Sequence, residues 1–418
     1  MFVIKYVAVA MLLAACASVQ QTTPAPAHGV EYRGGLWFDG NRFSPRTMYV
    51  ADGVFHSSRP QQVDSVVDLH GGYVVPPFSD AHQHLIDPRI DMTIRAFLSD
   101  GIFYVKDQGN APVMRRMIDP LLNRPSSFDY ISANQGWTSP GGHPVEVIKR
   151  APPMPGPMMA FLRDSLDPGI VNQVDTKADI DRRWAYFLAG KPDFVKVYLL
   201  TSEDYARRRS EALRFEGNRG IDPALVPYIV ERAHAAGLHV SAHVYTAADF
   251  RAAVNGGVDQ IAHLPGGKGA DSIYMLTDAD GANAAAHHVT VITTLTQHQD
   301  SALIYRILRT QSANNINVLR RHNVPILIGS DVMGATAAPE VALLAQSGLF
   351  TNLELLRMWS VTTPQAIFPN RRIGVLADGY EASFLVLRAD PIADIAATRS
   401  IAMRVKQGVF VDPAAKRR

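Results

Sequence analysis

The chain has 418 residues, of which 47% are hydrophobic and 19% charged, and its net charge is +2. This is the composition of a globular protein with a large core, and so small a net charge excludes a broad basic field for nucleic acid. The single cysteine, Cys16, excludes a disulfide bond within the chain.

The N-terminus is typical of an exported protein. Residues 1–15 contain one lysine and then an apolar run, Val7 to Ala15, that is too short to span a bilayer. They lead into LAAC, which resembles the lipobox of bacterial lipoproteins. The resemblance implies removal of the signal peptide, lipidation of Cys16 and, with Ala17 next, anchoring at the periplasmic face of the outer membrane. Residues 16–28 would be a flexible tether. The alternative is an ordinary secretion signal with a chance cysteine.

Two segments near the ends of the chain share a pattern of short strands and glycine turns. Residues 29–76 contain YRGGLWFDG and TMYVADGVF, and residues 370–418 contain ASFLVLRAD and MRVKQGVFV. We expect these segments to pair into one small β-sandwich.

Between them, residues 77–369 alternate strand-like and helix-like runs. The eight strand-like runs are YVVPPFSDAH, GIFYVKD, FDYISAN, DFVKVYLL, LHVSAHVY, VDQIAHL, VTVITTL and PILIGSD. Eight buried strands, each followed by a helix, predict an α/β fold of the (β/α)8 TIM-barrel class. The Pro-, Gly- and Met-rich segment 135–160 is predicted to be a loop over the active face, or an insertion.

The first barrel run ends in SDAHQHL, which contains two closely spaced histidines. His82 and His84 are two residues apart, so in a strand both imidazoles point to the same side. They stand at the C-terminal end of the strand, where barrels carry their active sites, and neutral imidazole is a good ligand for divalent metals. Asp80 lies one step deeper, where we expect a buried partner that orients an imidazole.

Four later runs each deliver another candidate metal ligand. These residues are Lys196, His243, His263 and Asp331. Each has a plainer interpretation alone: a core histidine, an edge-strand lysine or a helix N-cap. Together, on successive strand ends, they predict a metal site.

The order His-x-His, Lys, His, His, Asp resembles the binuclear branch of the amidohydrolase superfamily. VVPPFSDAHQHL, GIFYVKDQG and LADGYEASFLVLRADPIADI are similar to that family's opening, second-strand and closing motifs. The nearest group is the imidazolonepropionase-like enzymes that include Xaa-Pro dipeptidases. GIFYVKD departs from the pattern, with Phe103 and Tyr104 where two threonines are common, which leaves the substrate pocket open.

The resemblance implies two divalent metal ions, with zinc expected. His82, His84 and Asp331 would hold one ion, and His243 and His263 the other. Lys196 would form a carbamate with carbon dioxide and bridge the two. A metal-bridged hydroxide would attack an amide-type C–N bond, with Asp331 as general base and then general acid. The related deaminases usually carry a glutamate shuttle where Thr246 stands here, so the pattern favours the two-metal hydrolase.

The resemblance also suggests a substrate: dipeptides or N-acyl amino acids with a free carboxylate. Tyr245 and Arg251 would bind that carboxylate, and His143 in GGHP would line the pocket or stabilise the carbonyl oxygen. In the plainer interpretations Arg251 lies on the outer face of the following helix and His143 is a turn residue. The alternative functions are hydrolysis of cyclic amides or ureides, and a non-catalytic metal-binding lipoprotein. The oligomeric state is left open.

Overall fold

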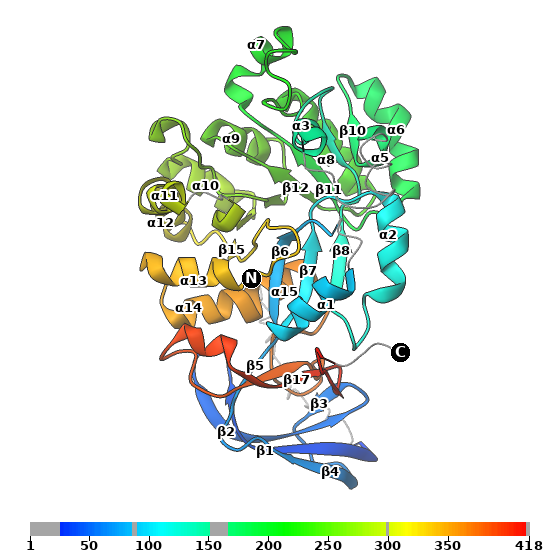
Figure 1. Cartoon of the computed structure of the whole chain (residues 1–418), viewed down its shortest axis with the longest axis vertical. Helices are drawn as coiled ribbons and strands as arrows, with labels where there is room; N and C mark the ends of the chain where they lie inside the picture. Colours follow the sequence, from blue (N-terminus) through cyan, green and yellow to red (C-terminus); the bar gives the residue numbers. More distant parts are fainter. Residues whose placement is uncertain (1–25, 86–89, 151–165, 298–300, 415–418) are drawn as a thin grey trace, which may run out of the picture.

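The computed structural model describes residues 26–85, 90–150, 166–297 and 301–414. A strand-rich part holds both ends of the described chain, and a barrel is formed by the residues between them (Figure 1). The predicted signal peptide, Cys16 and most of the predicted tether lie outside the described residues. Within the described ranges, no helix is both long and apolar enough to cross a membrane.

The N- and C-terminal segments form one eight-stranded sheet. Its strands are β1 (His28–Phe38), β2 (Phe43–Ala51), β3 (Val54–His56), β4 (Gln62–Asp68), β5 (Tyr73–Val75), β16 (Phe384–Leu387), β17 (Ile401–Lys406) and β18 (Val409–Phe410). The order is β18-β17-β16-β5-β1-β2-β3, with β4 also paired to β1. The two ends of the chain join where β16 runs antiparallel to β5.

An aromatic cluster fills the core of this sheet. The ring of Phe384 lies 5.0 Å from Tyr32 and 5.6 Å from Trp37, and Trp37 contacts Phe55 edge-on at 5.9 Å. All four side chains are buried, so the hydrophobic effect and these ring contacts hold the C-terminal strands to the N-terminal ones. The expected β-sandwich is therefore one hydrogen-bonded sheet, with a register shift in β1 between Tyr32 and Gly35.

Each barrel strand overlaps one of the eight predicted runs, although Tyr73–Val75 at the start of the first run form β5 of the sheet. They are β6 (Phe78–Gln83), β7 (Ile102–Asp107), β8 (Asp129–Ser132), β11 (Val195–Tyr198), β12 (Val240–His243), β13 (Gln260–Ile261), β14 (Thr290–Ile292) and β15 (Ile326–Leu327). They form two parallel ladders, β6-β7-β8 and a ladder that includes β11 to β15 in order. The first and last strands close the barrel, because Ala81 N donates to Ile328 O and Asp331 N to His82 O, each at 2.9 Å.

The segment predicted as a long loop contributes a strand that extends the second parallel ladder beyond β11. β9 (Gly136–Thr138) follows β8 and pairs with β11, and β10 (Val171–Gln173) pairs with β9 on its other side. Of the segment 135–160, predicted as a loop over the active face or an insertion, residues 136–138 thus form a strand and 145–150 a helix, while 151–160 lie outside the described residues. Trp137 explains why a strand forms there: its buried ring contacts Trp184 and Phe187 of helix α6 (Lys177–Ala189) at 5.6 and 5.3 Å, which anchors β9.

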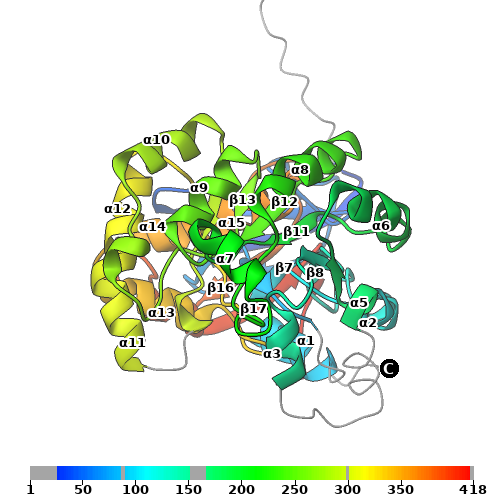
Figure 2. The ribbon, with the colours of Figure 1, turned by 90° about the horizontal axis from the view of Figure 1, so that it is seen from above.

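Helices surround the strands, as Figure 2 shows from above. They are α1 (Ile90–Ser99), α2 (Pro112–Ile118), α3 (Val145–Arg150), α5 (Leu166–Gly169), α6 (Lys177–Ala189), α7 (Tyr205–Ser210), α8 (Val226–Ala235), α9 (Ala247–Asn255), α10 (Asp278–Ala286), α11 (Ser301–Ile307), α12 (Ala313–Arg321), α13 (Ala338–Ser347), α14 (Asn352–Arg357) and α15 (Thr363–Ile367). Helices α6, α9 and α10 each begin at a threonine with an aspartate three residues later, a capping box that fixes where the helix starts. Figures 1 and 2 place α7 beyond the C-terminal ends of the strands.

Candidate metal centre

The two histidines of SDAHQHL meet Asp331 at the seam of the barrel. His82 Nε2 lies 3.3 Å and His84 Nε2 3.2 Å from the same oxygen, Asp331 Oδ1. The potential ligand atoms of these three residues all lie within 4.8 Å of one another. The prediction that the i, i+2 spacing aims both imidazoles at one point is thus confirmed in the fold.

The histidine rings are held so that Nε2 faces the site. Nδ1 of His82 lies 2.9 Å from Ala262 O, and Nδ1 of His84 lies 3.0 Å from Gly109 O. A carbonyl oxygen only accepts, so Nδ1 carries the proton in both rings and Nε2 presents its lone pair. His263 Nδ1 lies 2.8 Å from Thr294 Oγ1. Such partners fix ring orientation around metals.

The three remaining predicted ligands lie against this group. The ring of His263 is 4.5 Å from His82 and 4.4 Å from His243. Lys196 projects from β11 into the same interior, with Nζ 3.3 Å from Gln108 Oε1 and 5.5 Å from the centre of the Tyr198 ring. All six side chains predicted to hold metal therefore converge at the C-terminal end of the barrel.

In His84 burial would lower the pKa, but the hydrogen bond to Asp331 and the charge of that carboxylate outweigh it and raise the pKa. Burial keeps the other three histidines of the cluster in the neutral state that binds metals. It lowers the pKa of His82, His243 and His263 well below the usual value, so these imidazoles are neutral. It also lowers the pKa of Lys196 to about 7, although Asp331 opposes this. Within the described chain His82 Nε2 makes no hydrogen bond, a buried orphan that a metal ion would satisfy. The donor set therefore fits divalent ions such as zinc.

Asp331 is aimed by its backbone. Its φ is +52°, in the left-handed region that costs a non-glycine residue free energy. Asp80 supports the turn, accepting from the backbone N–H of His82 and of Ser330, each at 3.1 Å, and from Ser330 Oγ at 2.8 Å. Asp80 is buried as expected, but the expectation that it orients an imidazole was wrong, because its oxygens are used by backbone and hydroxyl donors and by Gln83 Nε2 at 2.8 Å. It joins the first strand to the last instead.

Among the predicted substrate-binding residues, His143 reaches the metal ligands. Its ring is 4.5 Å from His243 and 5.6 Å from Tyr198. Burial lowers its pKa to about 4, so the imidazole is neutral at neutral pH. Tyr245, two residues beyond His243, contacts Tyr274 edge-on, and its hydroxyl accepts a hydrogen bond from the Tyr274 hydroxyl at 3.2 Å.

Arg251 does not join the site. Its Nε and terminal nitrogen donate to the two oxygens of Asp280 at 2.7 and 2.9 Å, a bidentate ion pair between α9 and α10. The guanidinium edge that was expected to bind a carboxylate is occupied, so the outer-face alternative is the correct one. Thr246 also has a structural role, because its hydroxyl caps α9 by accepting from Asp249 N.

Several polar residues of the site carried no signal in the sequence. Tyr198 ends β11 against His143 and His243, and Gln108 follows β7 and contacts Lys196. Gln297 Nε2 lies 3.3 Å from His263 Nδ1. Lys106, a second buried lysine, donates to Gln260 Oε1 at 2.8 Å and lies over the Phe194 ring. The available signal in the sequence was that each is a polar residue near the end of a strand. Many ordinary loop residues share this property, so it does not identify a site residue.

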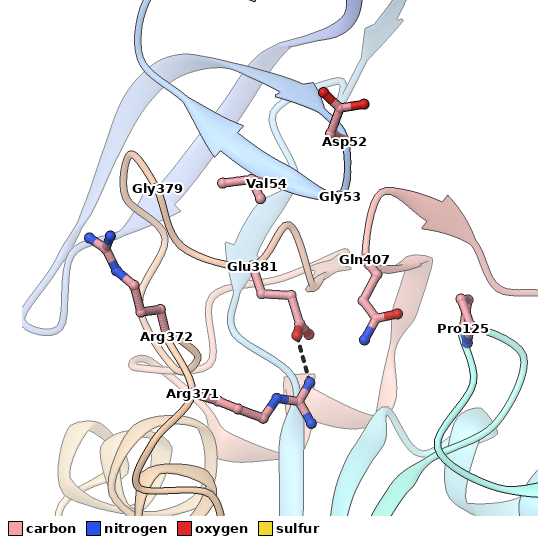
Figure 3. A pocket seen from close by; sticks show the side chains of 9 residues that line it. All are labelled: Asp52, Gly53, Val54, Pro125, Arg371, Arg372, Gly379, Glu381 and Gln407. Atoms are coloured by element: carbon pink, nitrogen blue, oxygen red, sulfur yellow. Dashed lines mark hydrogen bonds and ion pairs between the residues drawn. The ribbon is translucent and has the colours of Figure 1, made fainter. Parts of the chain in front are cut away.

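A separate hollow lies where the sheet meets the barrel (Figure 3). It is lined by Asp52, Gly53, Val54, Pro125, Arg371, Arg372, Gly379, Glu381 and Gln407. None of the predicted site residues lines it. The guanidinium of Arg371 forms ion pairs with Glu381 at 2.5 Å and with Asp129 at 2.8 Å, so it links the sheet to the barrel.

Known proteins resemble this chain in sequence and in fold. The model of the amidohydrolase family matches residues 204–411. An uncharacterized protein of Mycobacterium tuberculosis is 28% identical over 145 residues, and one of Mycobacterium bovis matches equally. The match covers 30% of this chain and 23% of each relative, so the chain spans less than a quarter of their length.

Three solved structures show the extent of the shared fold. A prolidase complexed with N-methylphosphonate-L-proline has a TM-score of 0.71 at 17% identity, covering 92% of this chain and 99% of that one. Ochratoxinase of A. niger has a TM-score of 0.71 at 16% identity, over 94% and 97%. A Xaa-Pro dipeptidase with bound methionine has a TM-score of 0.68 at 15% identity, over 92% and 100%.

The closed barrel and its clustered candidate metal ligands thus accompany a match to the amidohydrolase family over residues 204–411. Over this part of its sequence the chain is similar to that family.

Proposed function

We propose that this protein hydrolyses an amide-type C–N bond with the help of two divalent metal ions, zinc being the expected metal. The observation that carries the proposal is the convergence of six ligand-type side chains from five strand ends. His82, His84 and Asp331 would hold one ion, His243 and His263 the other, and Lys196 would bridge them. When bound, the ions would supply a Lewis acid for the substrate carbonyl and lower the pKa of a shared water.

Lys196 would bridge as a carbamate. The neutral amine attacks the carbon of carbon dioxide, a C–N bond forms, and one amine proton is released. A buried cation then becomes an anion with two oxygens, which suits a site lined by neutral imidazoles. A pKa of about 7 leaves much of the amine neutral and reactive at neutral pH.

The chain's own residues would move the proton and orient the substrate. Asp331, with Oδ1 beside both β6 histidines and Oδ2 3.8 Å from His263 Nδ1, would accept the proton of the attacking water and return it to the leaving nitrogen. His143, neutral and in contact with His243, would donate a hydrogen bond to the carbonyl oxygen.

The expected substrates are dipeptides or N-acyl amino acids. Two structural neighbours, the prolidase complexed with N-methylphosphonate-L-proline and the Xaa-Pro dipeptidase with bound methionine, support small amino-acid derivatives as substrates. Tyr245 remains a candidate for the substrate carboxylate, because its hydroxyl can still donate a hydrogen bond.

A neutral or cyclic amide, such as a ureide, is the second candidate. The observation that favours it is the Arg251–Asp280 ion pair, which removes the cation expected to bind a free carboxylate. A neutral substrate needs no such cation.

One experiment separates these candidates. The zinc-reconstituted protein is assayed with dipeptides, with the same dipeptides as C-terminal carboxamides, and with cyclic ureides. A carboxylate preference of tenfold or more in kcat/KM, about 1.4 kcal/mol, supports the first candidate, and equal rates support the second. In either case Arg251→Met should leave the preference unchanged. If no substrate is hydrolysed and Lys196→Ala leaves ligand affinity intact, the non-catalytic binding function is correct.

We also propose export and lipid anchoring through Cys16, at the periplasmic face of the outer membrane. The support is the LAAC sequence after a short apolar run. Mass spectrometry of protein from membranes should find an acylated N-terminal Cys16, and Cys16→Ser should release the protein into the soluble fraction. An unmodified wild-type N-terminus upstream of residue 16 would contradict the proposal.

A further inference from the structure

A saturated hydrogen-bond network lies beneath Lys196 inside the barrel. Gln108 donates from Nε2 to Ala81 O at 3.0 Å and to Gln260 Oε1 at 3.3 Å. Because Ala81 O can only accept, this end of the carboxamide is the nitrogen, and Oε1 faces Lys196. The orientation of Gln108 is therefore determined by its neighbours.

Gln108 Oε1 can accept one hydrogen bond from Lys196. A carboxamide oxygen has two lone pairs, and one of them accepts the Ser241 hydroxyl at 2.9 Å. The other accepts Lys196 Nζ at 3.3 Å. Among the described residues, this is the hydrogen bond that Lys196 makes.

The rest of the network offers Lys196 no further acceptor. Gln260 Oε1 already accepts from Gln108 and from Lys106, the latter at 2.8 Å, and Gln260 Nε2 donates to Thr290 Oγ1 at 3.1 Å. The hydrogen bond from Lys106 thus determines the orientation of the Gln260 carboxamide, which in turn determines the orientation of the Gln108 carboxamide. An ammonium on Lys196 would leave two of its three N–H groups without partners, whereas a carbamate keeps a single N–H.

We propose that Gln108 is a positioning residue for Lys196, whose carboxamide oxygen accepts the one N–H of the carbamylated side chain and so favours the carbamate over the ammonium. The inference rests on the proposed function. It implies that carbamylation of Lys196, and with it metal binding, depends on the concentration of carbon dioxide or bicarbonate. Lys106, which no step of the proposed hydrolysis uses, acts as the anchor of the network.

The test uses the full chain and ¹³C-bicarbonate. The carbamate carbon is followed by NMR, and bound zinc is measured as bicarbonate is raised. Gln108→Met, which keeps the volume but removes the acceptor, should raise the bicarbonate needed for half-maximal zinc loading by about tenfold, the factor expected for one lost buried hydrogen bond. Gln108→Glu keeps the shape but supplies a charged acceptor that suits an ammonium, so it should also lose the carbamate signal.

The control is Gln311→Met, which removes an equally buried carboxamide that hydrogen-bonds Gly267 and Asp271. It should lower thermal stability and leave the bicarbonate dependence unchanged. Wild-type carbamate signal and zinc loading in a folded Gln108→Met or Gln108→Glu would overturn the inference. If the wild-type protein hydrolyses amides with zinc but shows no carbamate, the inference about Gln108 is wrong while the proposed hydrolytic function stands. Wild-type protein that binds no metal would overturn the proposed function itself.

Discussion

The two ends of the barrel each bury a lysine, and they surround it differently. At the junction with the sheet, Lys406 Nζ donates to Asp129 Oδ1 at 2.5 Å, Ser127 O at 2.7 Å and Arg124 O at 2.8 Å. All three N–H groups are satisfied. At the opposite end Lys196 has one hydrogen-bond acceptor among the described residues, and its surroundings are neutral imidazoles and the more distant charge of Asp331.

The difference teaches that a buried charge alone does not mark a functional site. Lys406 has every partner that a structural cation needs, and Asp129 is further paired with Arg371. Lys196 has one hydrogen-bond acceptor among the described residues and His82 Nε2 has none, which is costly for buried groups unless a ligand completes their bonding. Incomplete hydrogen bonding, more than burial, distinguishes Lys196 and His82 from Lys406.

The largest expected effect sharpens this comparison. Lys196→Met should lower kcat/KM by about 1,000-fold or more, because the bridging ligand is lost, and bound zinc should fall with it. The free energy of unfolding of the metal-free protein should change by less than about 1 kcal/mol, since an under-satisfied charge is replaced by an apolar side chain. Metal analysis and urea denaturation check both results. A large loss of stability with full activity would contradict the functional role of Lys196 and indicate a structural one.

Lys406→Met should show the opposite pattern. Removing the cation leaves Asp129 buried with one partner fewer, and breaking such a pair costs about 3–5 kcal/mol of folding free energy. The fraction that remains folded should bind zinc and hydrolyse substrate as the wild type does. Guanidinium denaturation and zinc content per folded molecule measure these effects, and loss of zinc from folded protein would contradict the structural assignment.

Gly136→Ala tests how tightly the active end is packed. A Cβ there would lie 2.2 Å from Cε2 of Tyr198, which is already buried between the site and β9. The overlap should cost about 3 kcal/mol of stability and lower kcat by displacing the tyrosine. In a Tyr198→Leu background the same substitution should cost much less, and an equal cost in both backgrounds would exclude the clash.

The smallest effect concerns Asp259 at the start of β13, which accepts from Val240 N at 2.6 Å and contacts His234 and His239 at 3.0 and 3.2 Å. Burial would raise its pKa, but these hydrogen bonds outweigh it and lower the pKa to about 2. Its contribution, about 1–2 kcal/mol, is thus complete above pH 4 and lost as pH falls towards 2. Asp259→Asn should be less stable than wild type at pH 6, and the difference should vanish near pH 2. A difference independent of pH would exclude the carboxylate as its source.

The sequence predicted the barrel and the six metal-ligand candidates because both follow from short-range rules. His82 and His84 share a strand face by period, and the other ligands fall where parallel strands end. The partner of Arg251 could not be predicted, because Asp280 lies 29 residues away on the next helix and only their packing brings them together. Gln108 and Tyr198 were missed for the same reason: their roles depend on neighbours from other strands. β9 was missed because three residues between glycine and proline turns carry too little pattern.

The closing of the barrel has a consequence for how the protein matures. His82 and His84 come from the first strand and Asp331 follows the last, and they meet through the hydrogen bonds Ala81 N to Ile328 O and Asp331 N to His82 O. A chain still emerging from the ribosome cannot assemble this set until about four fifths of it has been made. These residues could therefore bind a metal ion only after the barrel has closed. A zinc ion held by them would link the first and last strands and raise the free energy of unfolding.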